Sequence, residues 1–445
     1  MEIRIPAPAE EIINKLNERG FEAYVVGGCV RDMLLGREPG DWDITTSALP
    51  VQVKSVFRRT VDTGIQHGTV TVLIGKEGYE VTTYRIDGEY SDGRHPNSVC
   101  FTPDLTEDLK RRDFTINAMA YNSRTGFVDV FGGVEDLNRK IIRCVGNPID
   151  RFTEDALRIL RAIRFSAQLG FEIEENTYKA IQVIAPNMVH VSKERIQVEL
   201  TKLLCSAHPE HIKLVYDTGI SPYVTDGFHM AYGAVNVDEI PSIPTSIPAK
   251  KHLRWAAFLR KCSSGMAAGI LKDLKLDNDT INKVRTLVQW LGKPLTAEKP
   301  DLRRIMSTMD DGLFDDLLTV KLCLAEAFED GKEIRKGQPQ NYKSQPEICS
   351  AQPDVPADTV EALLFIKGLT EEIRHDGDCI RMKNLAVSGN DVIKAGVKPG
   401  KEVGDVLAEL FDLVLEDPEE NAKERLLARV KERLTSMRPA SEQPV

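Results

Sequence analysis

Long apolar runs, secretory signals and paired cysteines are all missing from this 445-residue sequence. No stretch of about 18 apolar residues is available for a membrane span, and no segment has the apolar core of a secretory signal. The eight cysteines are scattered without a Cys-x-x-Cys pair, which argues against a disulfide or zinc framework and for reduced thiols. We therefore expect a cytoplasmic protein.

An excess of positive charge is also missing. The formal net charge is −10, whereas non-specific nucleic-acid binders are usually basic. Any RNA partner must then be held by local basic patches, and its binding should depend strongly on salt. The charge favours selective over indiscriminate nucleic-acid binding.

The first motif of interest follows an apolar run at residues 23–26, which predicts a buried strand. Gly27 and Gly28 then allow a tight turn and close approach of the backbone to a ligand. Residues 30–35 predict a short helix that ends at Gly36. Free N–H groups at a helix N-terminus suit a phosphate, so this turn is a candidate phosphate site.

Two carboxylates come next, at Asp41 and Asp43. On a strand, residues two apart point to the same face. Such a pair can hold two Mg²⁺ ions roughly 3.5–4 Å apart, as nucleotidyl transfer needs. Glu80, on an alternating stretch at 79–85, is a candidate third carboxylate, although a solvent-facing strand glutamate is the alternative. Together with the glycine turn, the pair indicates a nucleotidyltransferase.

A second cluster combines Arg111, Arg112 and Asp113 with Asn117. Guanidinium groups bind phosphate in a bidentate manner, and a carboxylate accepts hydrogen bonds from ribose hydroxyls. The cluster therefore suits a nucleoside triphosphate. The alternative is a helix with a charged, solvated face.

A third cluster starts a helix expected at 155–169, with Thr153 as its N-cap. Asp155 and Arg158 are three apart and share one helix face, while Glu154 and Arg158 could form an ordinary helical ion pair. A carboxylate only accepts hydrogen bonds and a guanidinium only donates them. Cytosine and adenine both present an amine donor beside a ring-nitrogen acceptor, whereas uracil and guanine present the reverse. Asp155 with Arg158 could therefore select C and A in place of a template base.

The chain divides into a mixed N-terminal region and a helical remainder, with Pro-containing connectors at 241–248 and 332–358, and no repeat. We expect strands at 23–26, 41–45, 69–74, 79–85 and 127–130, and helices that include 155–169 and 192–205. The expected fold class is α+β.

These motifs resemble the class II tRNA nucleotidyltransferases, the CCA-adding enzymes, and specifically their Bacillus-type branch. The matching residues appear in the family's order over about the first 205 residues. They are Gly27-Gly28, Arg31-Asp32, Asp41-x-Asp43, Arg111-Arg112-Asp113-Phe114-Thr-x-Asn117-Ala118, Asp129 with Gly132-Gly133, Glu154-Asp155-x-x-Arg158 with Arg161, and Glu194-Arg195 with Glu199-Leu200. A later segment, 385–404, also resembles the tail of that branch.

The resemblance implies a seahorse-like architecture, with a polymerase-β-like catalytic head at 1–138, a helical neck at 139–205, a body at 206–340 and a tRNA-binding tail at 341–445. It implies template-independent addition of C, C and A to tRNA 3′ ends from CTP and ATP with Mg²⁺.

By the same resemblance, the metal ligands would be Asp41 and Asp43, with Glu80 as a third catalytic carboxylate. The implied nucleotide-binding set is Gly27, Gly28, Arg31, Arg112, Asp113, Asn117, Asp155, Arg158, Arg161 and Arg164. Of these, the glycines and Arg31 would line the phosphate floor, and Asp155 and Arg158 would read the base.

Other activities stay open at this point. An enzyme that adds only the final A is one. By the resemblance, CC-adding relatives lack a loop that is intact here at 85–96, so full CCA addition and addition of A alone both stay open. A bacterial poly(A) polymerase shares the head motifs, but a more basic C-terminal part would be expected. A non-catalytic RNA-binding protein is disfavoured because both aspartates are present. His375-Asp376 could suggest a metal phosphohydrolase, but no matching ligand set stands nearby.

Overall fold

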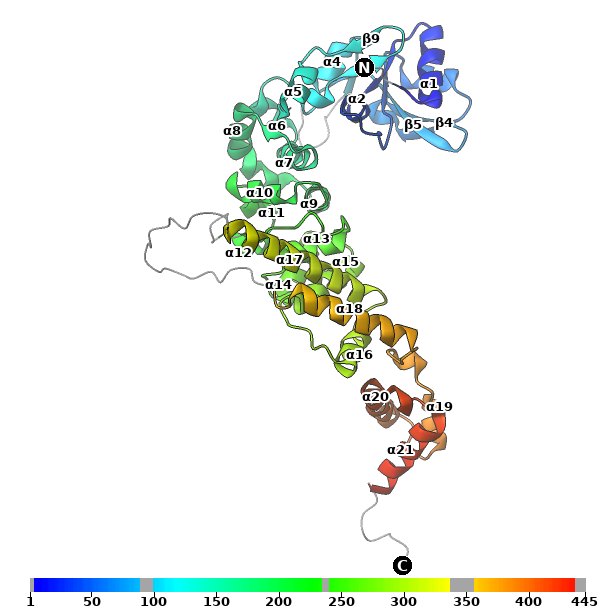
Figure 1. Cartoon of the computed structure of the whole chain (residues 1–445). Helices are drawn as coiled ribbons and strands as arrows, with labels where there is room; N and C mark the ends of the chain where they lie inside the picture. The colour runs from blue at the N-terminus through cyan, green and yellow to red at the C-terminus, as the bar shows by residue number, and fades with distance from the viewer. Residues whose placement is uncertain (1–3, 89–98, 234–239, 337–355, 437–445) are drawn as a thin grey trace, which may run out of the picture. The chain divides into compact units, whose positions relative to one another are not determined.

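A computed structural model describes residues 4–88, 99–233, 240–336 and 356–436 (Figure 1). It separates into two compact units. The first holds residues 1–240 together with 269–277, and the second holds 241–268 and 278–445. The four-part division into head, neck, body and tail stays a prediction.

The first unit is built on a seven-stranded sheet of order β3-β4-β5-β2-β1-β8-β9. Only β2 and β5 run parallel; the other neighbours are antiparallel. The strands are β1 (Ala23–Val26), β2 (Ile44–Thr46), β3 (Thr60–Gly64), β4 (Thr69–Ile74), β5 (Glu77–Thr83), β8 (Ala120–Asn122) and β9 (Gly126–Val128). The flanking helices are α1 (Ala7–Glu18), α2 (Gly28–Leu34), α3 (Pro50–Val56), α4 (Leu105–Lys110) and α5 (Gly133–Arg139).

One core of this sheet joins the strands to α4. Tyr24, Val26 and Ala120 from the strands pack with Leu105 and Leu109 of the helix. Since α4 leads directly into Arg111 and Arg112, this packing fixes where the arginine cluster begins.

Helices follow the sheet in the first unit, which also contains two short strand pairs outside this sheet. The strand pairs are β6 (Arg85–Asp87) with β7 (Val99–Phe101), and β10 (Ile141–Ile142) with β11 (Glu172–Ile173). The helices are α6 (Pro148–Glu154), α7 (Leu157–Leu169), α8 (Glu175–Ile184), α9 (Lys193–Leu204), α10 (Lys213–Asp217), α11 (Ser221–Val224) and α12 (Asp226–Tyr232).

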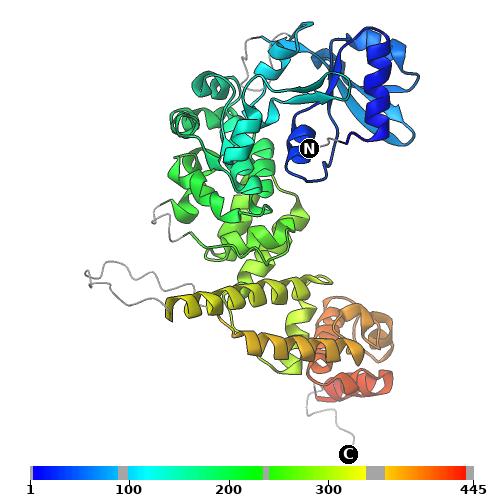
Figure 2. The same ribbon diagram turned by 45° about the horizontal axis from the view of Figure 1, so that its top comes forward.

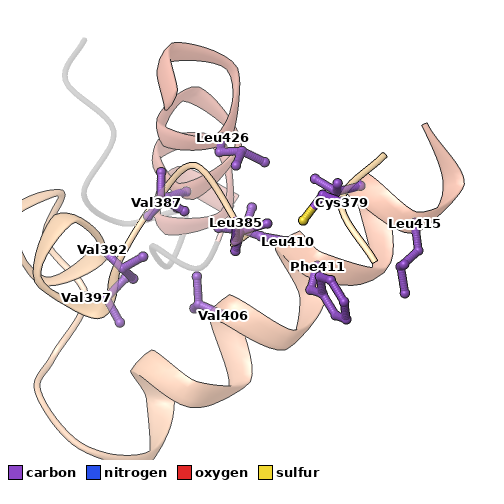
Figure 3. Packing of buried hydrophobic residues seen from close by; sticks show 12 residues of the cluster. Cys379, Leu385, Val387, Val392, Val397, Val406, Leu410, Phe411, Leu415 and Leu426 are labelled. Carbon is purple, nitrogen blue, oxygen red and sulfur yellow. The ribbon is translucent and has the colours of Figure 1, made fainter. Parts of the chain in front are cut away.

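The second unit is helical throughout its described part. It contains α13 (Lys251–Leu259), the start of α14 (Ser264–Asp273), α15 (Asn278–Leu291), α16 (Lys299–Ser307), α17 (Leu313–Lys336), α18 (Val360–His375), α19 (Gly389–Lys394), α20 (Lys401–Glu416) and α21 (Lys423–Ser436). The long helices α17 and α18 lie side by side (Figure 2). The last three helices share an apolar cluster that includes Val392, Val406, Leu410 and Leu426 (Figure 3).

The α+β prediction is confirmed, and so is a head sheet followed by helices. The predicted strands at 23–26 and 69–74 match β1 and β4. Two local expectations were wrong. Asp41 and Asp43 precede β2 instead of lying on it, and Thr153 lies within α6, where Asn147 is the N-cap. No helix in the described parts of the chain is long and apolar enough to span a membrane.

Candidate nucleotide-binding site

The glycine turn after β1 forms as the sequence predicts. Gly27 has φ 82° and ψ −126°, a conformation that side chains rarely adopt, and its N–H donates to the Met119 carbonyl at 3.1 Å. A Cβ atom at Gly27 would lie 2.8 Å from Nη1 of Arg112. The glycine therefore allows this arginine to lie directly against the turn.

Arg111 and Arg112 share a buried anchor, Asp108. Its carboxylate accepts from Arg111 Nε at 2.9 Å and lies 3.7 Å from Arg112 Nη2. Thr45 of β2 also donates to it, at 3.1 Å. Burial alone would raise the pKa of Asp108, but the two guanidinium groups outweigh burial and hold the pKa below its ordinary value. Arg111 and Arg112 are thus held by a buried, ionised carboxylate.

Asp43 lies directly before β2, next to Asp41 and Glu80. Its carbonyl accepts from Val26 N–H, and the parallel register of Ile44 with Val81 brings it beside Glu80. The Asp43 side chain reaches solvent, yet the surrounding protein disfavours its charge. That desolvation, with repulsion from Asp41 and Glu80 and partial relief from Arg112, raises the pKa of Asp43.

These three carboxylates are neighbours but not a closed ligand cage. In residues 4–88, 99–233, 240–336 and 356–436, no three His, Cys, Asp or Glu side chains gather closely enough to form one. Two-metal sites in phosphoryl transfer keep open positions for substrate oxygens, so an incomplete protein set is compatible with that chemistry.

Asp113 is the centre of a second buried network. Its Oδ2 accepts from Arg161 Nε at 2.9 Å and Nη2 at 2.7 Å, and its Oδ1 accepts from Asn117 Nδ2 at 3.0 Å. Asn117 Oδ1 in turn accepts from Arg31 Nη1 at 2.7 Å. Burial would raise the pKa of Asp113, but Arg161 and the Asn117 hydrogen bond hold it far below its usual range. The network joins α2, the segment after α4, and α7.

Three guanidinium groups surround the Phe165 ring of α7. Those of Arg31, Arg161 and Arg164 lie 5.1, 5.3 and 3.8 Å from its centroid. Arg164 is 6% exposed and donates to Glu199 of α9. Its contacts in this structure are therefore with protein groups deep between α7 and α9.

Asp155 and Arg158 are close in sequence but have different partners among the described hydrogen bonds. Asp155 lies in the extended break between α6 and α7, where its Oδ2 accepts from Arg195 Nη2 at 2.7 Å. Arg158 donates to Glu154 at 2.7 Å and to the Arg151 carbonyl at 2.9 Å. The expectation that both residues share one helix face was wrong, because the helix begins only at Leu157. The predicted Glu154–Arg158 ion pair is present.

An open cavity of about 470 Å³ adjoins the Asp155–Arg195 pair. Leu157, Arg195 and Val198 contribute to its walls. Its volume lies within the range of about 300–1,000 Å³ that is typical of small-molecule sites.

Comparison with known proteins decides the family. Residues 23–143 match the model of the poly A polymerase head domain, and residues 170–230 match that of the probable RNA and SrmB-binding site of polymerase A. The chain is 36% identical to a CCA-adding enzyme of Geobacillus kaustophilus over 95% of this chain and 96% of that one. The chain belongs to the CCA-adding enzyme family.

Other members of the family agree in length and fold. A CCA-adding enzyme of Enterococcus faecalis is 36% identical over 95% of both chains. The crystal structure of the Bacillus stearothermophilus CCA-adding enzyme in complex with CTP superposes with a TM-score of 0.74 and 31% identity. That match covers 98% of this chain and 99% of the other. The resemblance to the Bacillus-type branch is therefore confirmed.

Three residues that hold the site together were given no site role from the sequence: Asp108, Arg195 and Glu199. Arg195 and Glu199 were named only as part of the matching family motif. Asp108 had a local signal, since it precedes Arg111 and Arg112 by three and four residues on one helical turn. The other two act across elements. Arg195 reaches Asp155 from 40 residues away and Glu199 reaches Arg164 from 35 away, so no local pattern reports their partners.

The Asp129 and Gly132-Gly133 motif has a structural explanation. Asp129 accepts from the N–H groups of Gly133 and Val134 at 2.7 and 2.9 Å, which caps α5. A Cβ atom at Gly133 would lie 2.4 Å from the Thr115 carbonyl oxygen. The motif therefore packs α5 against the segment that carries Asn117. The loop predicted at 85–96 lies for the most part outside the described residues.

Proposed function

We propose that this chain adds C, C and A to the 3′ end of tRNA from CTP and ATP, without a nucleic-acid template. The two relatives compared over 95% of the chain are named CCA-adding enzymes, and one related structure holds CTP. The observation that carries the proposal is the Asp41–Asp43 pair directly before β2, beside Arg112 and the Gly27-Gly28 turn.

Mg²⁺ is the proposed metal, with Asp41 and Asp43 as its ligands and Glu80 as a third carboxylate. Carboxylate oxygens are the donors that Mg²⁺ prefers. The raised pKa of Asp43 fits this role, because a divalent cation would relieve the repulsion from Asp41 and Glu80. When bound, the metal would activate the attacking 3′ hydroxyl as a nucleophile and neutralise negative charge on the triphosphate.

The arginine cluster and the glycine turn would hold the triphosphate. Nε of Arg112 is buried without a hydrogen-bond partner among the described residues, so its neighbours do not saturate this guanidinium. Gly27, Gly28 and Arg31 would line the phosphate floor. Asp113, Asn117 and Arg161 would hold the ribose and phosphates, while Arg164 would contribute positive charge from beneath.

Asp155 and Arg158 would read the base. Asp155 uses one oxygen for Arg195 and the other for Leu157 N–H. A carboxylate offers about four acceptor positions, so capacity remains for the exocyclic amine of C or A. Arg158 would donate to the ring nitrogen. Uracil or guanine would place its N–H donor against Arg158 and its carbonyl acceptor against Asp155. Such mismatches are costly away from water.

Two related activities fit the same head and are separated by substrate. An enzyme that adds only A needs tRNA that already ends in CC, and a poly(A) polymerase extends unrelated RNA. Incubation with single nucleotides on tRNA lacking CCA, on tRNA lacking only A, and on oligo(A) distinguishes them. We expect C on the first, A on the second and almost none on oligo(A). A on the second substrate with no C on the first would establish A-only addition, and long tails on oligo(A) would establish poly(A) synthesis.

A tRNA-processing role agrees with the cytoplasmic location expected from the sequence, and that location stays a prediction.

A further inference from the structure

Helix α16 carries one arginine on its buried face and another on its exposed face. Arg303 is 4% exposed and lies beside the buried Leu302 and Met306, whereas the side chain of Arg304 is 46% exposed. Burying a guanidinium is costly unless its donors find acceptors. The contacts of Arg303 therefore need an explanation that those of Arg304 do not.

All three described contacts of Arg303 lead to the segment after α18. Its Nε donates to the Leu415 carbonyl at 2.6 Å, and its Nη2 donates to the Glu416 carbonyl at 2.7 Å. Its Nη1 donates to Asp378 Oδ2 at 2.8 Å. Leu415 and Glu416 are the last residues of α20, whose final carbonyls have no acceptor role within the helix. Arg303 therefore caps a helix that lies more than 100 positions away in the chain.

A second arginine makes the reciprocal connection. Arg381 donates through Nη1 to the carbonyl of Met306, near the end of α16, at 2.5 Å, and pairs with Asp311 at 3.0 Å. Each helix end is thus capped by an arginine from the other segment. Phe411 and Leu415 lie on the apolar cluster of α19–α21, so this double cap borders that cluster (Figure 3).

We propose that Arg303 is a positioning residue that fixes residues 378–436, the tail segment, to α16 so that its contacts with tRNA keep one geometry. This inference rests on the proposed function and on the tail's expected role in tRNA binding. The tail segment has two exposed lysines near the start of α20: Lys398 lies just before the helix, and Lys401 is its first residue. Their charges suit the phosphates of an RNA stem. Without Arg303, two carbonyls and Asp378 lose their buried donor, and the attachment of α20 to α16 loosens.

Steady-state kinetics of Arg303→Met on two substrates tests the inference. One substrate is full-length tRNA lacking CCA, and the other is a short hairpin that contains only the acceptor stem. We expect KM for full-length tRNA to rise about tenfold, with kcat and KM for CTP unchanged. The inference places the contacts of the tail segment on parts of tRNA beyond the acceptor stem, which the hairpin lacks, so the KM of the hairpin should stay at the wild-type value.

Arg304→Met is the matched control, because the pairs of Arg304 with Asp301 and with Glu416 of the tail segment are exposed at the surface and should contribute little. It should leave both substrates unaffected. Arg303→Lys keeps a charge for Asp378 but cannot cover both carbonyls, so we expect a partial return of KM.

Equal effects of Arg303→Met and Arg304→Met on tRNA would overturn the inference. So would an equal loss on tRNA and hairpin, since that would indicate a general defect. If Arg303→Met does not fold, Asp378→Asn decides: it keeps both carbonyl caps, and the inference requires a smaller KM rise confined to full-length tRNA. Absence of incorporation by the wild-type enzyme would instead contradict the proposed function.

Discussion

The carboxylates of the nucleotide-binding site fall into two electrostatic classes. Asp108 and Asp113 are buried among arginines, which lower their pKa values and keep them ionised. The pKa of Asp43 is raised by desolvation and by its acidic neighbours. The first class holds the arginines in place, whereas the second is left with unbalanced negative charge. A divalent cation would bind at this unbalanced charge, between Asp43 and its acidic neighbours.

Asp43→Asn should abolish incorporation of both C and A and also make the metal-free protein more heat-stable at pH 7.5. Its raised pKa means that the protonated form favours the folded state. This contribution is complete below the ordinary pKa of 3.8 and is lost as pH rises through the raised value. Removing the charge therefore helps at pH 7.5 and gives no benefit below about pH 3.8.

Thermal melting in EDTA across this pH range, together with an incorporation assay, checks both parts. Asp62→Asn, the same change at an exposed carboxylate paired with Lys54, is the control for general charge effects. Near-wild-type incorporation by Asp43→Asn would refute the metal assignment. A lower melting temperature at pH 7.5 would refute the electrostatic account.

Arg158→Ala should weaken nucleotide selection. It removes the proposed donor to the ring nitrogen of C and A. Mismatched polar edges cost roughly 1–3 kcal/mol each, so discrimination against UTP and GTP should fall by about one to two orders of magnitude. The measurement is kcat/KM for all four nucleotides on tRNA lacking CCA, with circular dichroism to confirm the fold.

Arg139→Ala serves as the surface control, since that side chain is 61% exposed and pairs only with Glu135 in the described contacts. If Arg158→Ala slows CTP and ATP but still rejects UTP and GTP as before, then Arg158 only supports Glu154 and the loop around it.

At the scale of elements, local patterns predict an element where its own residues determine it. The apolar run at 23–26 and the alternation at 69–74 match β1 and β4, and helix 192–205 matches α9 within one residue at each end. The strand predicted at 41–45 begins later, at Ile44, because that is the first residue that pairs with β1 and β5. The break at Asp155 was missed because its partner, Arg195, comes from another helix.

Gly133→Ala tests the packing of α5 against the Asn117 segment. The added Cβ would meet the Thr115 carbonyl and Met119 side chain, so overpacking should lower the free energy of unfolding by about 1–3 kcal/mol. Gly269→Ala, in the interior of α14 where the Cβ meets nothing within 4 Å, should instead be neutral or stabilising. Urea unfolding of both variants makes the comparison, and equal midpoints would contradict the role given to Gly133.

Removal of residues 87–94 should spare addition of both C residues and impair the final A. By the family resemblance, this loop is what CC-adding relatives lack. The removed stretch begins at Asp87, the last residue of β6, which pairs with Val99 of β7. Single-turnover addition to tRNA lacking CCA and to tRNA lacking A separates the two steps. If the shortened enzyme completes CCA at the normal rate, the loop has no role in adding the final A.

At the scale of the whole molecule, the chain combines two compact units with a net charge of −10. The candidate nucleotide site lies entirely in the first unit, and the double arginine cap lies in the second. An acidic protein must bind tRNA through local cations, so its affinity should fall steeply as salt rises. Because the nucleotide site and the double arginine cap lie in different units, mutations should alter the chemistry and the positioning of tRNA separately.

The central claim is that this protein, and no template, specifies C, C and A. The most direct measurement is sequencing of the products formed on tRNA lacking CCA when all four nucleoside triphosphates are present with Mg²⁺. We predict that tRNA ends in CCA and that growth then stops. Products with A tails of varied length, with U or G at these positions, or with no C added would contradict the account.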